Sequence, residues 1–169
     1  HWDRRLDSLL MWAVGSIHAI KGVEIGTAFK NASKPGGQVH DEIFIDDEDD
    51  LYRKTNNAGG FEGGITTGQP IVVRAAMKPI STVLNPRQSV DLATGEAAKT
   101  VYERSDFCAV PRAAVVGEAM VSITLAKALL EKIGGDSMDE VQERLSSLRE
   151  ANLKDINLDN STWRFGYDN

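Results

Sequence analysis

The clearest helical pattern in the chain, residues 111–133, limits the possible folds more than any other feature. Pro111 opens it, where the fixed φ of proline suits a first helical turn and its missing N–H costs no hydrogen bond. Gly134 and Gly135 follow, as glycine commonly does where a helix stops. Because apolar residues cover most of the circumference, the sequence predicts a buried helix. Such a helix requires a layered core or another subunit around it.

Upstream, apolar residues recur at spacings of three or four from Trp2 to Ile20, which predicts a helix with one apolar face. Gly22 is expected to end this helix, and the segment KGVEIGTAF predicts a short strand. Turn-forming residues at 31–38 predict a surface loop, and residues 43–45 predict a brief strand within a run of carboxylates. This run lacks the glycine and the ligand spacing of a calcium loop, so a solvated surface is favoured over a metal site.

The middle of the chain is rich in glycine. Residues 56–70 contain five glycines, at positions 59, 60, 63, 64 and 68. Either this segment is a flexible loop, or its backbone approaches something closely or adopts positive φ. The strand-like run IVVRAAMKPIST follows at once and carries Arg74 and Lys78, which favours the second interpretation. A two-stranded excursion is then expected, with SVDL and KTVYE as strands and ATG as the turn.

No linker divides the chain convincingly. Residues 1–150 are predicted to form one domain, and residues 151–169 a polar tail. Ser137 stands three residues before Glu140, as in the capping box that opens an amphipathic helix. The chain begins at His1 inside a helical pattern, with neither Met nor a capping residue before it. We interpret it as the C-terminal portion of a longer polypeptide.

Bulk composition argues against several classes of function. The net charge of -6 and the pI near 5.1 disfavour general binding to nucleic acid or to an anionic membrane. No stretch is expected to approach the roughly 20 apolar residues of a membrane span, and the first residues do not show a positively charged region followed by an apolar one. Cys108 is the only cysteine, which suits a reducing compartment. We therefore expect a soluble cytoplasmic protein, in which any anionic ligand is held by a local cluster of bases.

Several bases between Gly60 and Arg112 form such a candidate cluster. They are Arg74, Lys78, Arg87, Lys99, Arg104 and Arg112. Arginine side chains and glycine-rich backbone N–H groups bind carboxylate and phosphate oxygens, although scattered surface charges would give the same pattern. Asp106 stands between Arg104 and Arg112. It is either part of a structural ion pair or a carboxylate placed for proton transfer.

Three segments resemble signature regions of the chorismate synthase family. They are SIHAIKGVEIGTAF, GGITTGQPIVVRAAMKPIST and RSDFCAVPRAAVVGEAM, and they occur in the family's order. The resemblance implies an α+β fold, in which helices lie between two antiparallel sheets, and a homotetrameric assembly. It also implies a flavin-dependent carbon–oxygen lyase of the shikimate pathway.

The resemblance implies a definite reaction. Chorismate synthases bind reduced FMN and convert 5-enolpyruvylshikimate 3-phosphate to chorismate by anti-elimination of phosphate, with loss of a ring hydrogen and no net redox change. The flavin lends electron density while phosphate leaves, and the protein supplies positioning and electrostatics. Some members also reduce the flavin with NADPH. Substrate and cofactor are both polyanions, which suits a basic pocket lined by glycine.

The resemblance also implies roles for individual residues. Asp106 matches the aspartate near flavin N5 that helps to manage the proton, and Arg104 matches the arginine that touches flavin and substrate. The other matched residues are expected to bind the flavin, and no metal is implied. They are His18, Ala19, Gly63, Lys78, Pro79, Ile80, Ser81 and Thr82.

Some features depart from the family pattern. Position 18 is often Gln or Asn, position 81 is often Pro, and position 112 is often apolar where this chain has Arg112. Family members are longer, and their N-terminal half supplies an SHG-type motif, two catalytic histidines and several arginines that are absent here. We therefore expect the chain alone to be inactive. The main alternative is a non-catalytic folding or oligomerisation domain that binds neither flavin nor substrate, and a small anion-binding regulatory module is a third hypothesis.

Overall fold

The structure is a computed structural model that describes residues 1–47, 50–103 and 108–148. Its helices are η1 (Trp2–Arg4), α1 (Leu6–Gly15), α2 (Ala28–Asn31), η2 (Gly36–Gln38), α3 (Val110–Ile133) and α4 (Met138–Ser146). Its strands form antiparallel pairs: β1 (Ile20–Ile25) with β6 (Val73–Met77), β2 (Ile43–Ile45) with β3 (Leu51–Arg53), β4 (Phe61–Glu62) with β5 (Ile65–Thr66), and β7 (Gln88–Val90) with β8 (Ala97–Lys99). The α+β class predicted from the sequence is confirmed. The predicted tail, residues 151–169, lies outside the described residues.

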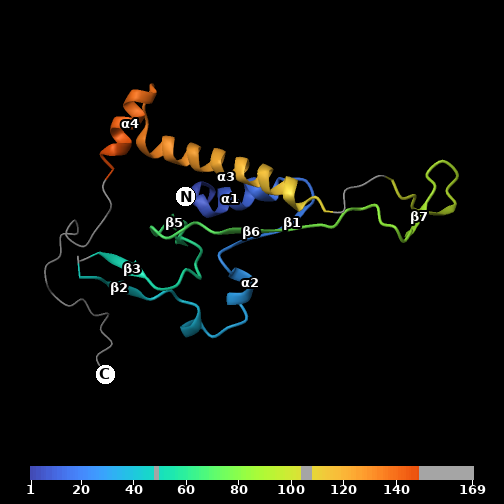
Figure 1. Ribbon diagram of the computed structural model, residues 1–169, viewed down its shortest axis with the longest axis horizontal. Helices are drawn as coiled ribbons and strands as arrows, with labels where there is room; N and C mark the ends of the chain where they lie inside the picture. The colour runs from blue at the N-terminus through green and yellow to red at the C-terminus, as the bar shows by residue number, and fades with distance from the viewer. Residues whose placement is uncertain (48–49, 104–107, 149–169) are drawn as a thin grey trace.

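The β1–β6 ribbon is the centre of the structure. Helices α1 and α3 lie side by side along one of its faces, and α2 lies on the other (Figure 1). Alternate residues of β6 face the two helices, as the period of two in a strand requires. The small core is centred on α1, and its buried apolar residues are Leu10, Ala13, Val14 and Phe61.

Helix α1 ends at Gly15, five residues earlier than the apolar spacing predicts. The Ser16 hydroxyl donates to the Ala13 carbonyl at 2.7 Å, and Ala19 takes a left-handed φ of 66° that no helix can continue through. Ile20 then pairs with Met77 in the ribbon. The expected helix to Ile20 was therefore wrong, because pairing with a distant strand overrides a local helical period.

Gly22 does not end a helix, as the sequence suggested, but lies inside β1. The register of β1 against β6 shifts between Ile20 and Gly22, which marks an irregularity of the β-bulge kind. A glycine within a strand commonly accompanies a bulge or a close approach of another chain segment. The short strand predicted over this region is confirmed, with its start moved back to Ile20.

Helix α3 begins at Val110, has Pro111 in its first turn, and ends before Gly134, whose φ is 63°. Its start and stop were thus predicted correctly. Burial of the helix in a core of this chain was also expected and is not observed, because within the described part of the chain no residue of α3 is buried. One side of α3 packs along α1, and an ion pair between Arg4 of η1 and Glu131 joins α3 to the start of the chain. The other side of α3 is uncovered. Contact of that side with another subunit, the alternative expected from the sequence, stays a prediction.

The length and composition of α3 correct a further expectation. Val110–Ile133 has a mean hydropathy of 1.7 in its most apolar window, so it is long and apolar enough to cross a bilayer. The sequence had been expected to contain no such stretch. Core helices of soluble proteins meet the same two criteria, so the finding rests on length and composition only.

The last helix follows its prediction, and the excursion after β6 is a hairpin, as expected. Its second strand was placed wrongly, because β8 is Ala97–Lys99 and shares only Lys99 with the predicted KTVYE strand. The β7–β8 hairpin extends away from the ribbon and the helices (Figure 1). Helix α4 carries the predicted N-cap, because the Ser137 Oγ accepts the Glu140 N–H at 3.3 Å. The Glu140 carboxylate in turn accepts the Asp136 N–H at 3.0 Å, which satisfies a second free donor at the start of the helix.

Candidate functional site

The segment after β6 forms a shallow hollow of about 490 Å³. Four of the residues predicted to bind the cofactor line it, together with Arg87 from the predicted basic cluster, and the exposed Lys78 side chain stands at its edge. Both cations therefore border one concave surface. The lining residues are Lys78, Pro79, Ile80, Ser81, Val83, Asn85 and Arg87.

Another predicted segment reaches the same end of the ribbon. The Lys78 backbone N–H donates to the Ala19 carbonyl at 2.7 Å. Among the described residues Ala19 is the only non-glycine with positive φ, a conformation that costs about 1–2 kcal/mol for an L-residue. His18 precedes it with an exposed side chain. The structure thus places His18 and Ala19 beside Lys78, and their role in one site stays a prediction.

The glycine-rich segment forms the β4–β5 hairpin, whose turn is Gly63 and Gly64 with φ of 61° and 83°. The Arg5 side chain covers Gly64, since a Cβ placed there would lie 2.6 Å from Arg5 Cγ. No atom lies within 4 Å of the corresponding position at Gly63, so this part of the backbone is open. The flexible-loop interpretation of the segment is wrong, and the positive-φ interpretation is confirmed.

The base of this hairpin is tied to the start of β6. Asn56 accepts the Gly60 N–H at 2.8 Å through Oδ1 and donates to the Pro70 carbonyl at 2.8 Å through Nδ2. The Gly59 carbonyl accepts the Val72 N–H at 3.0 Å. Five glycines of the segment have positive φ, which lets the chain turn at each of these points; they are Gly59, Gly60, Gly63, Gly64 and Gly68.

The hairpin and the Lys78 hollow lie at opposite ends of β6. Val72 contacts the hairpin base, and Lys78 follows the far end of the strand, about 20 Å away at about 3.3 Å per residue. The expectation that the glycine turn and the lysine segment form one wall of a pocket is therefore not met within one chain. Arg104 and Asp106, the third piece of that wall, lie outside the described residues.

The predicted basic cluster is divided as well. Arg74 lies on β6 and pairs with Glu24 of β1 at 2.7 Å, so its charge is balanced on the ribbon. Lys99 lies on β8, in register with Gln88 of β7. Of the described bases, Lys78 and Arg87 are the two that share a hollow.

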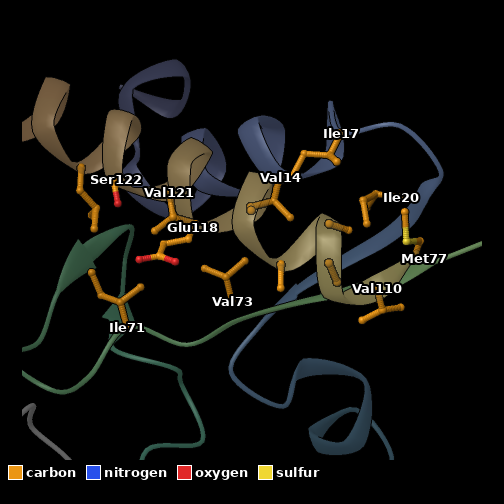
Figure 2. A pocket seen from close by; sticks show the side chains of 15 residues that line it. Val14, Ile17, Ile20, Ile71, Val73, Met77, Val110, Glu118, Val121 and Ser122 are labelled. Atoms are coloured by element: carbon orange, nitrogen blue, oxygen red, sulfur yellow. The ribbon is translucent and has the colours of Figure 1, made fainter. Parts of the chain in front are cut away.

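An apolar groove of about 500 Å³ runs between α3 and the β1–β6 ribbon, and its position was not predicted from the sequence (Figure 2). Val73 and Ile71 face Val121 of α3 across it, Val110 lies at the other end near Met77, and Glu118 brings a carboxylate into these apolar surroundings (Figure 2). No lysine or arginine lines the groove, so it does not suit a phosphate. Its surface suits another apolar segment of polypeptide.

A buried carboxylate, Asp41, was missed among the acids interpreted as solvated. It accepts hydrogen bonds from the Thr55 hydroxyl at 2.6 Å and from the backbone N–H groups of Asn57 and Ala58 at 2.8 Å each. Burial raises the pKa of Asp41, but these hydrogen bonds together lower it below its ordinary value. The signal that could have found it is its place beside a strand, before a Thr-Asn-Asn segment rich in donors.

Asp7 is the second buried acid. Burial raises its pKa, and the Arg5 guanidinium together with the Ser8 N–H lowers the pKa by more. No group of three or more His, Cys, Asp or Glu side chains that could hold a metal ion occurs within the described ranges. The acidic run continues through positions 48 and 49, which lie outside them.

Acid is expected to destabilise the protein through these two carboxylates. Because each pKa is lowered from an ordinary value of 3.8, each contributes stability above that pH and loses it as pH falls through the lowered pKa. Urea midpoints measured at pH 6 and pH 3 should therefore differ, and Asp41→Asn should reduce the difference. Equal differences in the variant and the parent would contradict the assignment to Asp41.

Comparison with known proteins decides the family. Residues 1–130 match the family model described as "Chorismate synthase". The chain belongs to the chorismate synthase family. Chorismate synthase of Chlorobaculum tepidum is 61% identical over 149 residues, which cover 88% of this chain and 38% of that protein. Chorismate synthase of Thermus thermophilus is 55% identical over 150 residues, covering 89% and 39%.

A solved structure supports the same family. "Crystal Structure of Chorismate Synthase" matches with a TM-score of 0.68 and 50% identity, over 86% of this chain and 36% of that one. The chain thus spans less than two fifths of these chorismate synthases' length, by the 38% and 36% coverage of the first relative and the solved structure. The family predicted from the three sequence segments is confirmed.

Proposed function

We propose that this chain forms part of a chorismate synthase, which uses reduced FMN to eliminate phosphate from 5-enolpyruvylshikimate 3-phosphate. The family match over residues 1–130 carries this proposal. The hollow bordered by Lys78 and Arg87 supports it, because two cations at one concave surface suit a phosphorylated ligand. The enzyme catalyses a step of aromatic amino acid biosynthesis in the cytoplasm.

The residues at the hollow fit the cofactor that the family implies. Lys78 offers a positive charge and the Ser81 hydroxyl a hydrogen-bond donor to phosphate oxygens, and Thr82, next in the chain but not part of the lining, carries a second hydroxyl. The Ala19 carbonyl holds the Lys78 backbone through a 2.7 Å hydrogen bond, which fixes where the lysine side chain begins. When bound, reduced FMN supplies the electron density that the departure of phosphate requires.

The other assignments belong to the same proposal. Arg104 contacts flavin and substrate, and Asp106 helps to remove the ring proton. Gly63 presents open backbone to the flavin, with no atom within 4 Å of the place where a Cβ would stand. Because Gly63 and Lys78 lie at opposite ends of β6, each contributes to a pocket that needs protein beyond this chain's ribbon. NADPH reduces the flavin where a member has that activity.

The groove along α3 supports a homotetramer. It is apolar, about 500 Å³ in volume, and bordered by a helix with no residue buried in the described part of the chain. Apolar surface of this kind is stabilised by contact with further protein. The same observation favours the second candidate function, a folding and oligomerisation domain that binds neither flavin nor substrate. Gel filtration with flavin absorbance separates the two, since a colourless oligomer supports the second candidate.

Replacing Lys78 tests the flavin site. In the complete polypeptide that contains these residues, Lys78→Met keeps the aliphatic stem and removes the charge, so FMN should bind about ten- to a hundredfold more weakly with substrate present. Lys30→Met, at an exposed position on α2, is the matched control and should bind FMN as the parent does. Flavin absorbance titration measures both. Equal affinity in Lys78→Met and the parent would remove Lys78 from the site.

A further inference from the structure

We propose that Asp41 is a positioning residue that sets flavin affinity by holding the glycine hairpin (residues 59–68) in place. This inference rests on the proposed function, which assigns Gly63 of that hairpin to the flavin. Asp41 lies just before β2, outside the three segments that match the family motifs. Its effect is therefore transmitted through other residues, without contact to the flavin.

The first step is the set of hydrogen bonds that Asp41 accepts. Oδ1 accepts the Thr55 hydroxyl at 2.6 Å, the Asn57 N–H at 2.8 Å and the Asn57 side-chain amide at 3.0 Å. Oδ2 accepts the Ala58 N–H at 2.8 Å. One carboxylate thus accepts two backbone N–H groups, of Asn57 and Ala58, and two side-chain donors, of Thr55 and Asn57. Hydrogen bonds to a charged acceptor are about twice as strong as neutral ones.

The second step connects residues 55–58 to the hairpin. Asn57 is also held from the other side, because its carbonyl accepts the Asn31 side-chain amide at 3.0 Å. The chain then passes directly into Gly59, which is packed against Gly26, and into Gly60. Both glycines have positive φ, so the path into the hairpin depends on how residues 55–58 are anchored.

Asp41 differs from the acids around it. It is 9% exposed, whereas the neighbouring Glu42 is an exposed residue. A buried carboxylate persists only when hydrogen bonds compensate for its lost hydration. Replacing it with asparagine would turn one acceptor oxygen into an N–H group facing other N–H and O–H donors. The substitution keeps the size of the side chain and breaks the anchor.

The test compares flavin affinity across matched variants of the complete polypeptide, each measured below its own unfolding temperature. Asp41→Asn should weaken FMN binding at least about tenfold, and Thr55→Val, which removes one donor, about threefold. Thr55→Ser keeps the hydroxyl and should restore the parent affinity. Glu42→Gln is the control at the exposed neighbour and should leave affinity unchanged. A role in stability alone would lower the melting temperature without changing the affinity of the folded protein.

The outcomes separate this inference from the proposed function. If the parent protein binds FMN and Asp41→Asn binds it equally well, the inference is overturned and the proposed function stands. If Asp41→Asn does not fold, Thr55→Val against Thr55→Ser decides, and equal affinities in that pair overturn the inference. A parent protein that binds no FMN overturns the proposed function itself.

Discussion

Gly59→Ala is expected to destabilise the protein by about 3 kcal/mol. Gly59 has a φ of 66°, which costs an L-residue about 1–2 kcal/mol. An added Cβ would also collide with the backbone of Gly26, and forced shifts of packed groups typically cost about 1–3 kcal/mol more. Neither segment can move alone, because Gly26 donates to the Val72 carbonyl at 2.8 Å and Gly59 accepts from Val72. Urea denaturation of variant and parent measures the loss.

Gly68→Ala is the matched control for this result. Gly68 has a φ of 80°, yet no atom lies within 4 Å of the place where its Cβ would stand. Its substitution therefore carries the conformational cost of about 1–2 kcal/mol without the collision. If Gly59→Ala and Gly68→Ala lose the same free energy of unfolding, the close approach of Gly26 and Gly59 does not exist in the folded protein.

Leu10→Ala is expected to cost about 2–5 kcal/mol, the usual range for removing a large apolar side chain from a core. Leu10 is 0% exposed and lies on α1, the helix that packs against both α3 and the β1–β6 ribbon. The described core has few other buried residues to take its place. The free energy of unfolding from urea titration gives the cost, and the loss should appear in the near-ultraviolet signal of tertiary packing.

Leu92→Ala is the control for Leu10. Leu92 is 96% exposed in the turn of the β7–β8 hairpin, so removing its side chain should change stability by no more than about 0.5 kcal/mol. Comparable losses at Leu10 and Leu92 would mean that α1 does not form the core described for this fold.

Local patterns predicted the elements whose stability is local. Helix α3 has Pro111 in its first turn and ends before Gly134 because proline and glycine act on the backbone at their own positions. The Ser137 cap and the β7–β8 hairpin follow from residues a few positions apart. The end of α1 could not be predicted in this way, because the following residues form β1, which pairs with β6 some fifty residues later in the chain.

The sequence predicted which segments the candidate site would contain, but it did not predict how those segments are arranged in space. Lys78 and Arg87 do share a hollow, since a strand delivers the residues that follow it to one place. Gly63 lies away from them because β6 is extended, and an extended strand separates what flanks it. The burial of Asp41 was not predicted, because its hydrogen-bond donors come from a later segment of the chain. The residues next to Asp41 are acidic and do not distinguish it from a solvated carboxylate.

The most direct test of the account is turnover by the complete polypeptide in which these residues occur. The assay supplies reduced FMN and 5-enolpyruvylshikimate 3-phosphate, and measures chorismate, inorganic phosphate and the redox state of the flavin. The account predicts chorismate and phosphate in equal amounts, with the flavin recovered in its reduced form. A folded protein that binds both ligands and releases no phosphate would contradict it.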